Sequence, residues 1–224
     1  MKLCIAIPSY DLTIPVETAV HLSQATATLQ RNGIPVTMQW GTASLIDLNR
    51  SRLIKRFLYE TECDKLFFLD ADIIFKTEDF LRLVMHSQKY DAVGAIYPRR
   101  ADPPKFFMKV KPDRELTVNE DGLMEIIGMG MGFCIIDRKV FDKMRPLVPV
   151  VQTADDAQLE FFCDIRYSPT HCGEDISFFK RWCEDCGGKV FIDPAINLKH
   201  VGRKEFEYDF FQYLDEKCIR DSNG

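Results

Sequence analysis

The sequence predicts an α/β fold, in which a mostly parallel central sheet is flanked by helices, with a small antiparallel hairpin and a C-terminal tail. Strand-like and helix-like segments alternate through the first hundred residues. The strand-like segments are short apolar runs, which is typical of strands buried on both faces of a sheet. The chain has 224 residues, 46% of them hydrophobic, and can therefore bury one sizeable core.

The first half supplies the elements of this sheet. It predicts strands at residues 2–8, 34–40, 65–69 and 91–97, and helices at 15–31, at 48–62 and from Thr77 onward. Pro15 near its start and Gly33 just past its end delimit the first helix. In such sheets ligands collect at the carboxyl ends of the strands, so the residues that follow each strand are the first candidates for a site.

The second half departs from this alternation. A hairpin at 114–127 is expected to turn at Asp121-Gly122. Residues 146–172 have no clear period and are predicted to form a long loop, which suggests a functional role. The other predicted elements are a strand at 132–137, helices at 138–144 and 174–186, a last strand at 189–193, and a tail from Pro194.

Charge and composition limit the possible functions. With 29 basic and 34 acidic residues the formal net charge is −5, which argues against a protein held to nucleic acid by bulk charge. No apolar run is long enough to span a bilayer, and the first residues lack the pattern of a signal peptide. A cytoplasmic location is therefore expected, in which the eight cysteines would be thiols.

Two acidic motifs are candidates for chemistry. Asp70-Ala71-Asp72 directly follows an apolar strand, where both carboxylates could approach one divalent cation; a solvated strand end is the plainer interpretation. Glu174 and Asp175 open a helix, where the dipole alone favours acids. Asp175 also shares a helical face with aromatic residues, and a carboxylate in an apolar setting suits a general base.

Other residues gain meaning only in combination. Gly128, Gly130 and Gly132 let the backbone pass very close to another group, or they form a simple bend. Arg50 lies on an apolar helix stripe and needs an anionic partner, either a phosphate or a protein carboxylate. His200 matters only if the tail folds back to the sheet.

The cysteines leave one question open. Cys183 and Cys186 form a single CxxC within a predicted helix, and Cys163, His171 and Cys172 are nearby in sequence. Buried structural thiols fit this pattern better than a zinc site does, because the spacings match no strong zinc motif.

Taken together, these motifs resemble those of a GT-A fold glycosyltransferase, a Rossmann-like family, in its family 2-like branch. The DxD motif is Asp70-Ala71-Asp72, the glycine-rich loop lies at 128–132, the xED motif is Gly173-Glu174-Asp175, and the C-terminal His is His200. The order of the four motifs is that of the family. The segment at 48–53 is also similar to its Ala-Arg-Asn segment, with Ser51 in place of the Asn.

The resemblance implies a metal-dependent transfer of a sugar from a nucleotide-diphosphate sugar, with UDP favoured, to an acceptor hydroxyl with inversion. It implies Asp72 and His200, with Asp70, as ligands of Mn²⁺ or Mg²⁺. It also implies Asp175 as the general base and Glu174 as the second catalytic residue. It places the remaining donor-binding residues at Pro8, Ser9, Tyr10, Arg50, Asp70, Ala71, Gly130 and Gly132.

The resemblance also implies that residues 1–224 form a single domain with two halves and a tail. Residues 1–100 would bind the nucleotide sugar, 101–202 would hold the acceptor and catalytic half, and 203–224 would be a tail. The acceptor could be a glycan, a protein, a small molecule or a modified nucleic-acid base. The last would need a basic surface near the site, and a modest one could be formed by Arg99, Arg100, Lys105, Lys109 and Lys111.

Two alternatives to a glycosyltransferase remain. A nucleotidyltransferase would use the same scaffold and metal carboxylates, but the segment after the first strand, Pro8-Ser9-Tyr10-Asp11, has neither a glycine nor a basic residue. A non-catalytic module that binds a nucleotide or a glycan is the second, and slow hydrolysis of a nucleotide sugar would exclude it.

Overall fold

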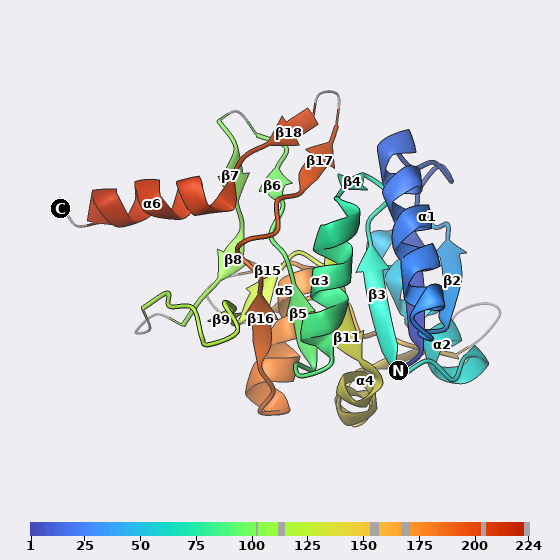
Figure 1. The fold of residues 1–224 in the computed structure, drawn as a ribbon. Coiled ribbons are helices and arrows are strands. Elements are labelled where there is room, and N and C mark those ends of the chain that lie inside the picture. Colours follow the sequence, from blue (N-terminus) through green and yellow to red (C-terminus); the bar gives the residue numbers. More distant parts are fainter. Residues whose placement is uncertain (102, 112–114, 153–156, 167–170, 203–204, 222–224) are drawn as a thin grey trace.

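The computed structural model describes residues 1–101, 103–111, 115–152, 157–166, 171–202 and 205–221 (Figure 1), and it confirms the predicted fold class. Its centre is a seven-stranded sheet in the order β2-β1-β3-β11-β5-β16-β9. β11 and β9 run against the other five strands. These strands are Leu3–Pro8 (β1), Val36–Gly41 (β2), Lys65–Leu69 (β3), Ala92–Gly94 (β5), Met124–Ile126 (β9), Phe133–Asp137 (β11) and Val190–Ile192 (β16).

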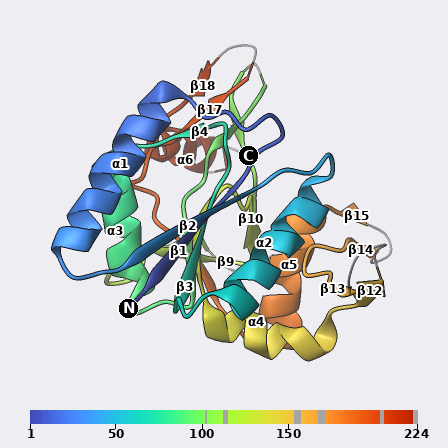
Figure 2. The same ribbon diagram turned by 90° about the vertical axis from the view of Figure 1, so that its right-hand side faces the viewer.

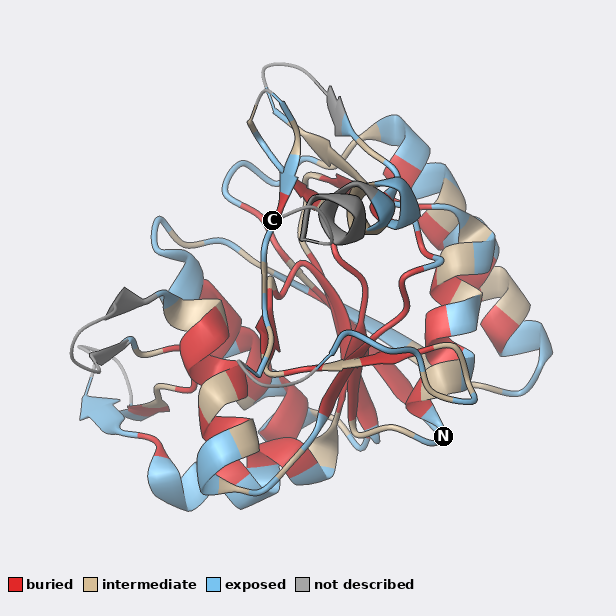
Figure 3. Cartoon of the chain, turned by 90° about the vertical axis from the view of Figure 1, so that its left-hand side faces the viewer, coloured by how far each residue is buried: buried red, intermediate tan, exposed pale blue. Residues whose placement is uncertain are grey.

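Helices cover both faces of the sheet (Figure 2). One face carries Val16–Arg31 (α1) and Thr77–Ser87 (α3), and the other carries Ile46–Glu60 (α2), Arg138–Met144 (α4) and Glu174–Lys180 (α5). Alternate side chains of β1 point to opposite faces, so that Leu3 and Ile5 pack with α1 and α3 while Cys4 and Ala6 pack with α2. The buried residues in Figure 3 follow the strands and the inner sides of these helices.

Small antiparallel pairings surround the sheet. They involve Ile73–Ile74 (β4), Pro98–Arg99 (β6), Lys105–Phe106 (β7), Met108–Lys109 (β8), Gly128–Met129 (β10), Val150–Gln152 (β12), Ala157–Leu159 (β13), Ile165–Arg166 (β14), His171–Cys172 (β15), Lys199–Val201 (β17) and Glu205–Glu207 (β18). The pairs are β6 with β7, β8 with β10, β12 with β13, and β14 with β15, and β17 lies between β4 and β18. No described helix is both long and apolar enough to cross a membrane.

The long loop predicted at 146–172 is wrong for its described part. A 3-10 turn at Arg145–Leu147 (η1) is followed by the β12–β13 hairpin and by the β14–β15 pair. Residues 153–156 and 167–170 lie outside the described residues. Strands of two or three residues are too short to show an alternation of polar and apolar residues, so no period could indicate them.

Three other predicted elements differ in extent. The strand predicted at 91–97 is confined to β5, and β6 begins at Pro98. The turn at Asp121-Gly122 is present, with φ +77° at Gly122. The described hairpin is reduced to one antiparallel bridge between Val118 and Met124, and β9 pairs with β16 on its other side. The helix predicted at 174–186 is α-helical only to Lys180 and continues as a π-helical turn at Arg181–Asp185 (η2).

The C-terminal segment returns to the chain that follows β3. β17 pairs with β4, placing His200 opposite Ile73, and the Val201 N–H donates to the Asp72 carbonyl at 2.8 Å. Beyond it lies the helix Phe210–Asp221 (α6), and Phe210 packs against Phe106 with ring centroids 5.1 Å apart. The tail predicted at 203–224 therefore contains a strand and a helix.

Arg138 fixes the end of α2, the helix that carries Arg50. Its guanidinium donates to the carbonyls of Cys63 at 2.7 Å, Phe57 at 2.9 Å and Leu58 at 3.1 Å, and lies 4.3 Å from the Phe57 ring centroid. The last carbonyls of a helix have no partner within the helix, so one side chain here supplies several missing donors.

We expect Arg138→Met to lower the free energy of unfolding by about 3 kcal/mol, because several carbonyls would lose a charged donor. Chemical denaturation measures the loss, and Lys139→Met, a change of charge at the adjacent exposed residue, is the matched control. Equal stability of the two variants would show that α2 does not depend on this cap.

Candidate functional site

The antiparallel strand β11 brings distant segments to one edge of the sheet. It lies between β3 and β5, so its first residues meet the carboxyl ends of those strands. The Asp70 N–H donates to the Gly132 carbonyl at 2.9 Å. The acidic motif after β3 and the glycine-rich loop before β11 are therefore neighbours.

Arg50 lies at the centre of the side chains that meet at the carboxyl ends of these strands. Its side chain is 3% exposed, and one guanidinium nitrogen donates to both Asp70 oxygens at 2.9 and 3.0 Å. Another nitrogen donates to Asp175 and lies 3.5 Å from the Glu174 carboxylate. The guanidinium also lies 5.6 Å from the Phe162 ring centroid. The partners are thus protein carboxylates, one of the two possibilities that the sequence left open.

Asp175 has a pKa raised to about 6. Burial is the main cause, because it disfavours the charged form, and the negative charges of Glu174 and Asp70 act in the same direction. The Arg50 charge and the Met131 N–H, which donates to Asp175 at 3.0 Å, oppose this rise. Asp175 is consequently ionised at neutral pH yet close to accepting a proton.

The glycine-rich loop passes close to protein side chains. A Cβ on Gly130 would lie 2.3 Å from the Tyr97 hydroxyl, and one on Gly132 would lie 2.6 Å from an Asp70 oxygen. The Tyr97 hydroxyl accepts from the Gly132 N–H at 3.3 Å, and burial raises the pKa of Tyr97 well above its usual value. Larger residues at either glycine would displace the carboxylate or the hydroxyl that the loop encloses.

Asp72 faces His200. The His200 Nε2 atom is 3.5 Å from an Asp72 oxygen, while Nδ1 is 2.9 Å from the Pro98 carbonyl. Arg100 also forms an ion pair with Asp72. Burial alone would raise the pKa of Asp72, but the hydrogen bond and charge of His200, with the charge of Arg100, outweigh it and lower the pKa.

This pair could contribute to a metal site. If Nδ1 donates its proton to Pro98, Nε2 turns a lone pair toward a carboxylate, and two acceptors this close need a proton or a cation between them. In the described part of the chain no three His, Cys, Asp or Glu residues are grouped to hold a metal. Two protein ligands can hold a cation when a substrate supplies the others, as phosphates commonly do for Mg²⁺.

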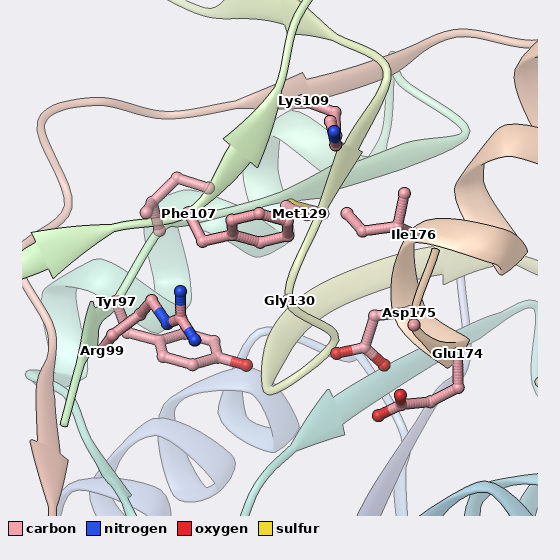
Figure 4. Close-up of a pocket in the computed structure, with 11 residues that line it drawn as sticks. Tyr97, Arg99, Phe107, Lys109, Met129, Gly130, Glu174, Asp175 and Ile176 are labelled. Carbon is pink, nitrogen blue, oxygen red and sulfur yellow. The ribbon is translucent and has the colours of Figure 1, made fainter. Parts of the chain in front are cut away.

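Two hollows adjoin the carboxylates that Arg50 binds. The first, of about 450 Å³, contains Asp70 and the residues after β1, and it is lined by Pro8, Tyr10, Asp11, Thr13, Ile46, Asp70, Ala71, Asp72 and Arg100. The second, of about 490 Å³, contains Asp175 and is lined by Ile96, Tyr97, Arg99, Phe107, Lys109, Met129, Gly130, Gly173, Glu174, Asp175 and Ile176 (Figure 4). We call them the Asp72 pocket and the Asp175 pocket.

The residues predicted for donor binding occupy different places. Pro8, Tyr10, Asp70 and Ala71 line the Asp72 pocket, whereas Gly130 lines the Asp175 pocket. Ser9 is buried beside Asp11 and lines neither pocket. Arg50 and Gly132 lie behind the carboxylates, holding Asp70 in place rather than lining either pocket.

Sequence reasoning missed two contributors. Tyr97 closes the glycine-rich loop and packs edge-on against His200 with centroids 5.2 Å apart; its only signal is its position at the end of the strand predicted at 91–97. Arg100 is predicted only as part of a basic surface, and its ion pair with Asp72 had no signal in the sequence.

The cysteine cluster gives no metal site among the described side chains. Cys163 accepts from Arg181 at 2.8 Å, and Cys183 and Cys186 pack against the core. Burial raises the pKa of Cys183 to about 12, which keeps it a thiol. The side chains of His171 and Cys172 lie outside the described residues.

Comparison with known proteins extends to structure only. No protein-family model matches this sequence, and no curated protein matches it. Among solved structures, A197 from STIV is similar, with a TM-score of 0.58 and 19% identity over 92% of this chain and 94% of that chain.

Two weaker likenesses are to GalNAc-T7, whose structure holds UDP, GalNAc and Mn²⁺, and to 4-diphosphocytidyl-2C-methyl-D-erythritol synthase from Anaerococcus prevotii DSM 20548. Their TM-scores are 0.46 and 0.42, each with 13% identity, over 91% and 85% of this chain and 44% and 87% of theirs. The likeness to A197 shows the Rossmann-like fold alone, and the two weaker ones support nothing further.

Removing the charge of Asp175 should stabilise the fold in alkaline solution. Because its pKa is raised in the folded state, ionised Asp175 costs stability above about pH 6, and the cost disappears as the pH falls toward 4. Asp175→Asn should therefore gain about 2 kcal/mol at about pH 8 and little at about pH 4.5.

Thermal or chemical unfolding at the two pH values measures this gain. Arg50→Met is the opposing variant: it leaves carboxylates without their buried partner and should lose about 3 kcal/mol or more at about pH 8. A gain for Asp175→Asn that does not change with pH would contradict the raised pKa.

Proposed function

We propose that this chain is a metal-dependent glycosyltransferase that moves a sugar from a nucleotide-diphosphate sugar, with UDP favoured, to an acceptor hydroxyl with inversion. The observation that carries the proposal is the position of Asp175. It is a buried carboxylate with a pKa of about 6 that lines one pocket, while Asp70, bound to the same Arg50, lines the other. A donor on one side and an acceptor on the other would meet at this cluster.

In this proposal Asp72 and His200 hold Mn²⁺ or Mg²⁺. The bound ion would supply positive charge to offset the charge that develops on the leaving nucleoside diphosphate. The fit rests on the facing carboxylate and imidazole and on the Pro98 carbonyl, which fixes the ring of His200. Asp70 is a weaker candidate ligand, because both its oxygens already accept from Arg50.

Asp175 would take the proton of the acceptor hydroxyl. Its raised pKa makes it basic enough to do so, and Arg50 and the Met131 N–H hold its two oxygens in a fixed orientation. Glu174 would tune this base through its negative charge, which raises the pKa of Asp175. Attack from the side opposite the leaving diphosphate would invert the anomeric carbon.

The proposal assigns the donor mainly to residues 1–100 and the acceptor mainly to 101–202. The Asp72 pocket contains an acid, Asp11, after β1, where a nucleotidyltransferase would carry a glycine-rich basic loop. This disfavours that alternative, which the donor experiment below tests together with a non-catalytic module.

A thermal-shift screen of UDP-, GDP-, ADP- and CMP-sugars should find one nucleotide that raises the melting temperature only with Mn²⁺, because ligands of the native state stabilise it by mass action. Asp72→Ala should abolish this metal-dependent shift. Asp47→Ala, an exposed acid at the start of α2, is the matched control and should keep it.

Slow hydrolysis of the same donor would then distinguish an enzyme from a binding module. Nucleoside triphosphates are a second set of ligands in the same screen, and a shift with them alone would favour the nucleotidyltransferase. No shift with any donor would contradict the proposed function.

The transfer reaction itself should depend on Asp175. We expect Asp175→Asn to keep donor binding and to lose transfer by about 10²–10⁴-fold, the usual contribution of a general base. In the wild type, kcat/KM should fall below about pH 6 as Asp175 takes up a proton.

Glu174→Gln should move that acid limb to lower pH, because it removes a negative charge that raises the pKa of Asp175. An unchanged pH profile in Glu174→Gln, or transfer at the wild-type rate in Asp175→Asn, would refute the assignment of the base.

A further inference from the structure

Residues 98–111, from β6 to just past β8, form a positively charged strip in a protein whose formal net charge is negative. Residues 98–111 contain five basic residues and one acid, whereas the whole chain has a formal charge of −5. The basic residues of this strip are Arg99, Arg100, Lys105, Lys109 and Lys111. Arg100 pairs with Asp72, and Lys111 lies 3.7 Å from Glu125.

The other three have no acidic partner in the described part of the chain. Arg99 and Lys105 are directly opposite each other in the β6–β7 pair, where like charges destabilise an antiparallel pairing. The Arg99 guanidinium instead lies 5.8 Å from the Phe107 ring centroid. An anion beside Arg99 would offset this repulsion.

The strip alternates between the core and the Asp175 pocket. Phe106, Met108 and Val110 pack with the core, whereas Phe107 and Lys109 line the pocket. Phe107 is 41% exposed, so its ring is accessible to a ligand in this pocket. An apolar ring thus lies beside one cation, Arg99, and lines the same pocket as a second, Lys109.

Charge is divided across this pocket. Figure 4 shows Arg99 and Phe107 on one side of the glycine-rich loop and Asp175 and Glu174 on the other, with Lys109 at the upper end. A ligand with an anionic group would be attracted to the cations and repelled by the two acids. Its orientation would be fixed, with an uncharged hydroxyl left for Asp175.

We infer that the acceptor is a small anionic molecule, which carries a phosphate or a carboxylate bound by Arg99 and Lys109, an apolar or ring face against Phe107, and its reacting hydroxyl at Asp175. This rests on the proposed function for the role of Asp175 only. The anion site itself is independent of it. The donor diphosphate would use the Asp72 pocket, where Arg100 is the lining cation.

Phenyl phosphate, benzoate and phenol test the site without knowledge of the acceptor. They share a ring and differ in charge, and binding is measured by calorimetry or by NMR shifts at low salt, with UDP and Mn²⁺ present to fill the donor side. We expect phenyl phosphate or benzoate to bind at least about tenfold more tightly than phenol, and the tighter of the two identifies the anion.

The double variant Arg99→Gln/Lys109→Gln should lose about tenfold or more of that affinity and leave phenol binding unchanged. The matched control is Arg31→Gln/Lys139→Gln, which removes the same two charges at exposed positions outside the strip. Both altered positions in the strip are exposed, so the fold should tolerate them, and circular dichroism confirms it. Lys109→Gln alone serves if the double variant does not fold.

Equal binding of phenol and the anions, or undiminished anion binding in the strip variant, would overturn the inference. Short single-stranded DNA is a further probe. If it binds more tightly than phenyl phosphate, and if the same variant loses this binding, the inference is overturned in favour of a nucleic-acid acceptor. If no nucleotide sugar gives a thermal shift in the wild type, the proposed function fails, but the anion site is still judged by these results. A shift with a nucleotide sugar and Mn²⁺, without a preference for the anions, refutes only this inference.

Discussion

The buried charge of Arg50 constrains the whole site. A guanidinium that is 3% exposed must be paired, because an isolated charge in the interior is very unfavourable. Its partners come from the end of β3 and the start of α5, so the pairing joins both halves of the chain. One cation among three carboxylates leaves an excess of negative charge. Burial raises the pKa of Asp175 to about 6, and this excess of negative charge acts in the same direction, against the opposing charge of Arg50.

The backbone makes this cluster possible. An antiparallel β11 among parallel strands delivers the glycine-rich loop to the edge where β3 ends. The loop must then pass Tyr97 and Asp70 at distances that exclude a side chain. On the opposite side of the DxD motif, the pairing of β17 with β4 returns His200 to Asp72. Two local reversals of the chain therefore assemble residues that are far apart in the sequence.

The elements that could be predicted from the sequence are those whose signal is local. The strands at 2–8 and 65–69 are continuous apolar runs, and the helix at 15–31 has its own start and stop residues. The short strands within 146–172 gave no period to detect. Arg50 and Asp175 are separated by 125 positions, and nothing in either neighbourhood specifies the other. The sequence could indicate that Arg50 needs an anion, but only the fold decides which anion it contacts.

The same reasoning applies to the charges that face the solvent. Salt limits electrostatic effects to about 8–10 Å, so a net charge of −5 says little about what one pocket attracts. In the Asp175 pocket the local charges decide: Arg99 and Lys109 line it together with Asp175 and Glu174. A neutral ligand could enter such a pocket in many orientations. An anionic ligand is held in one orientation, with its charged group toward the cations. Positioning of the reacting group in this way supplies much of the catalytic benefit of binding.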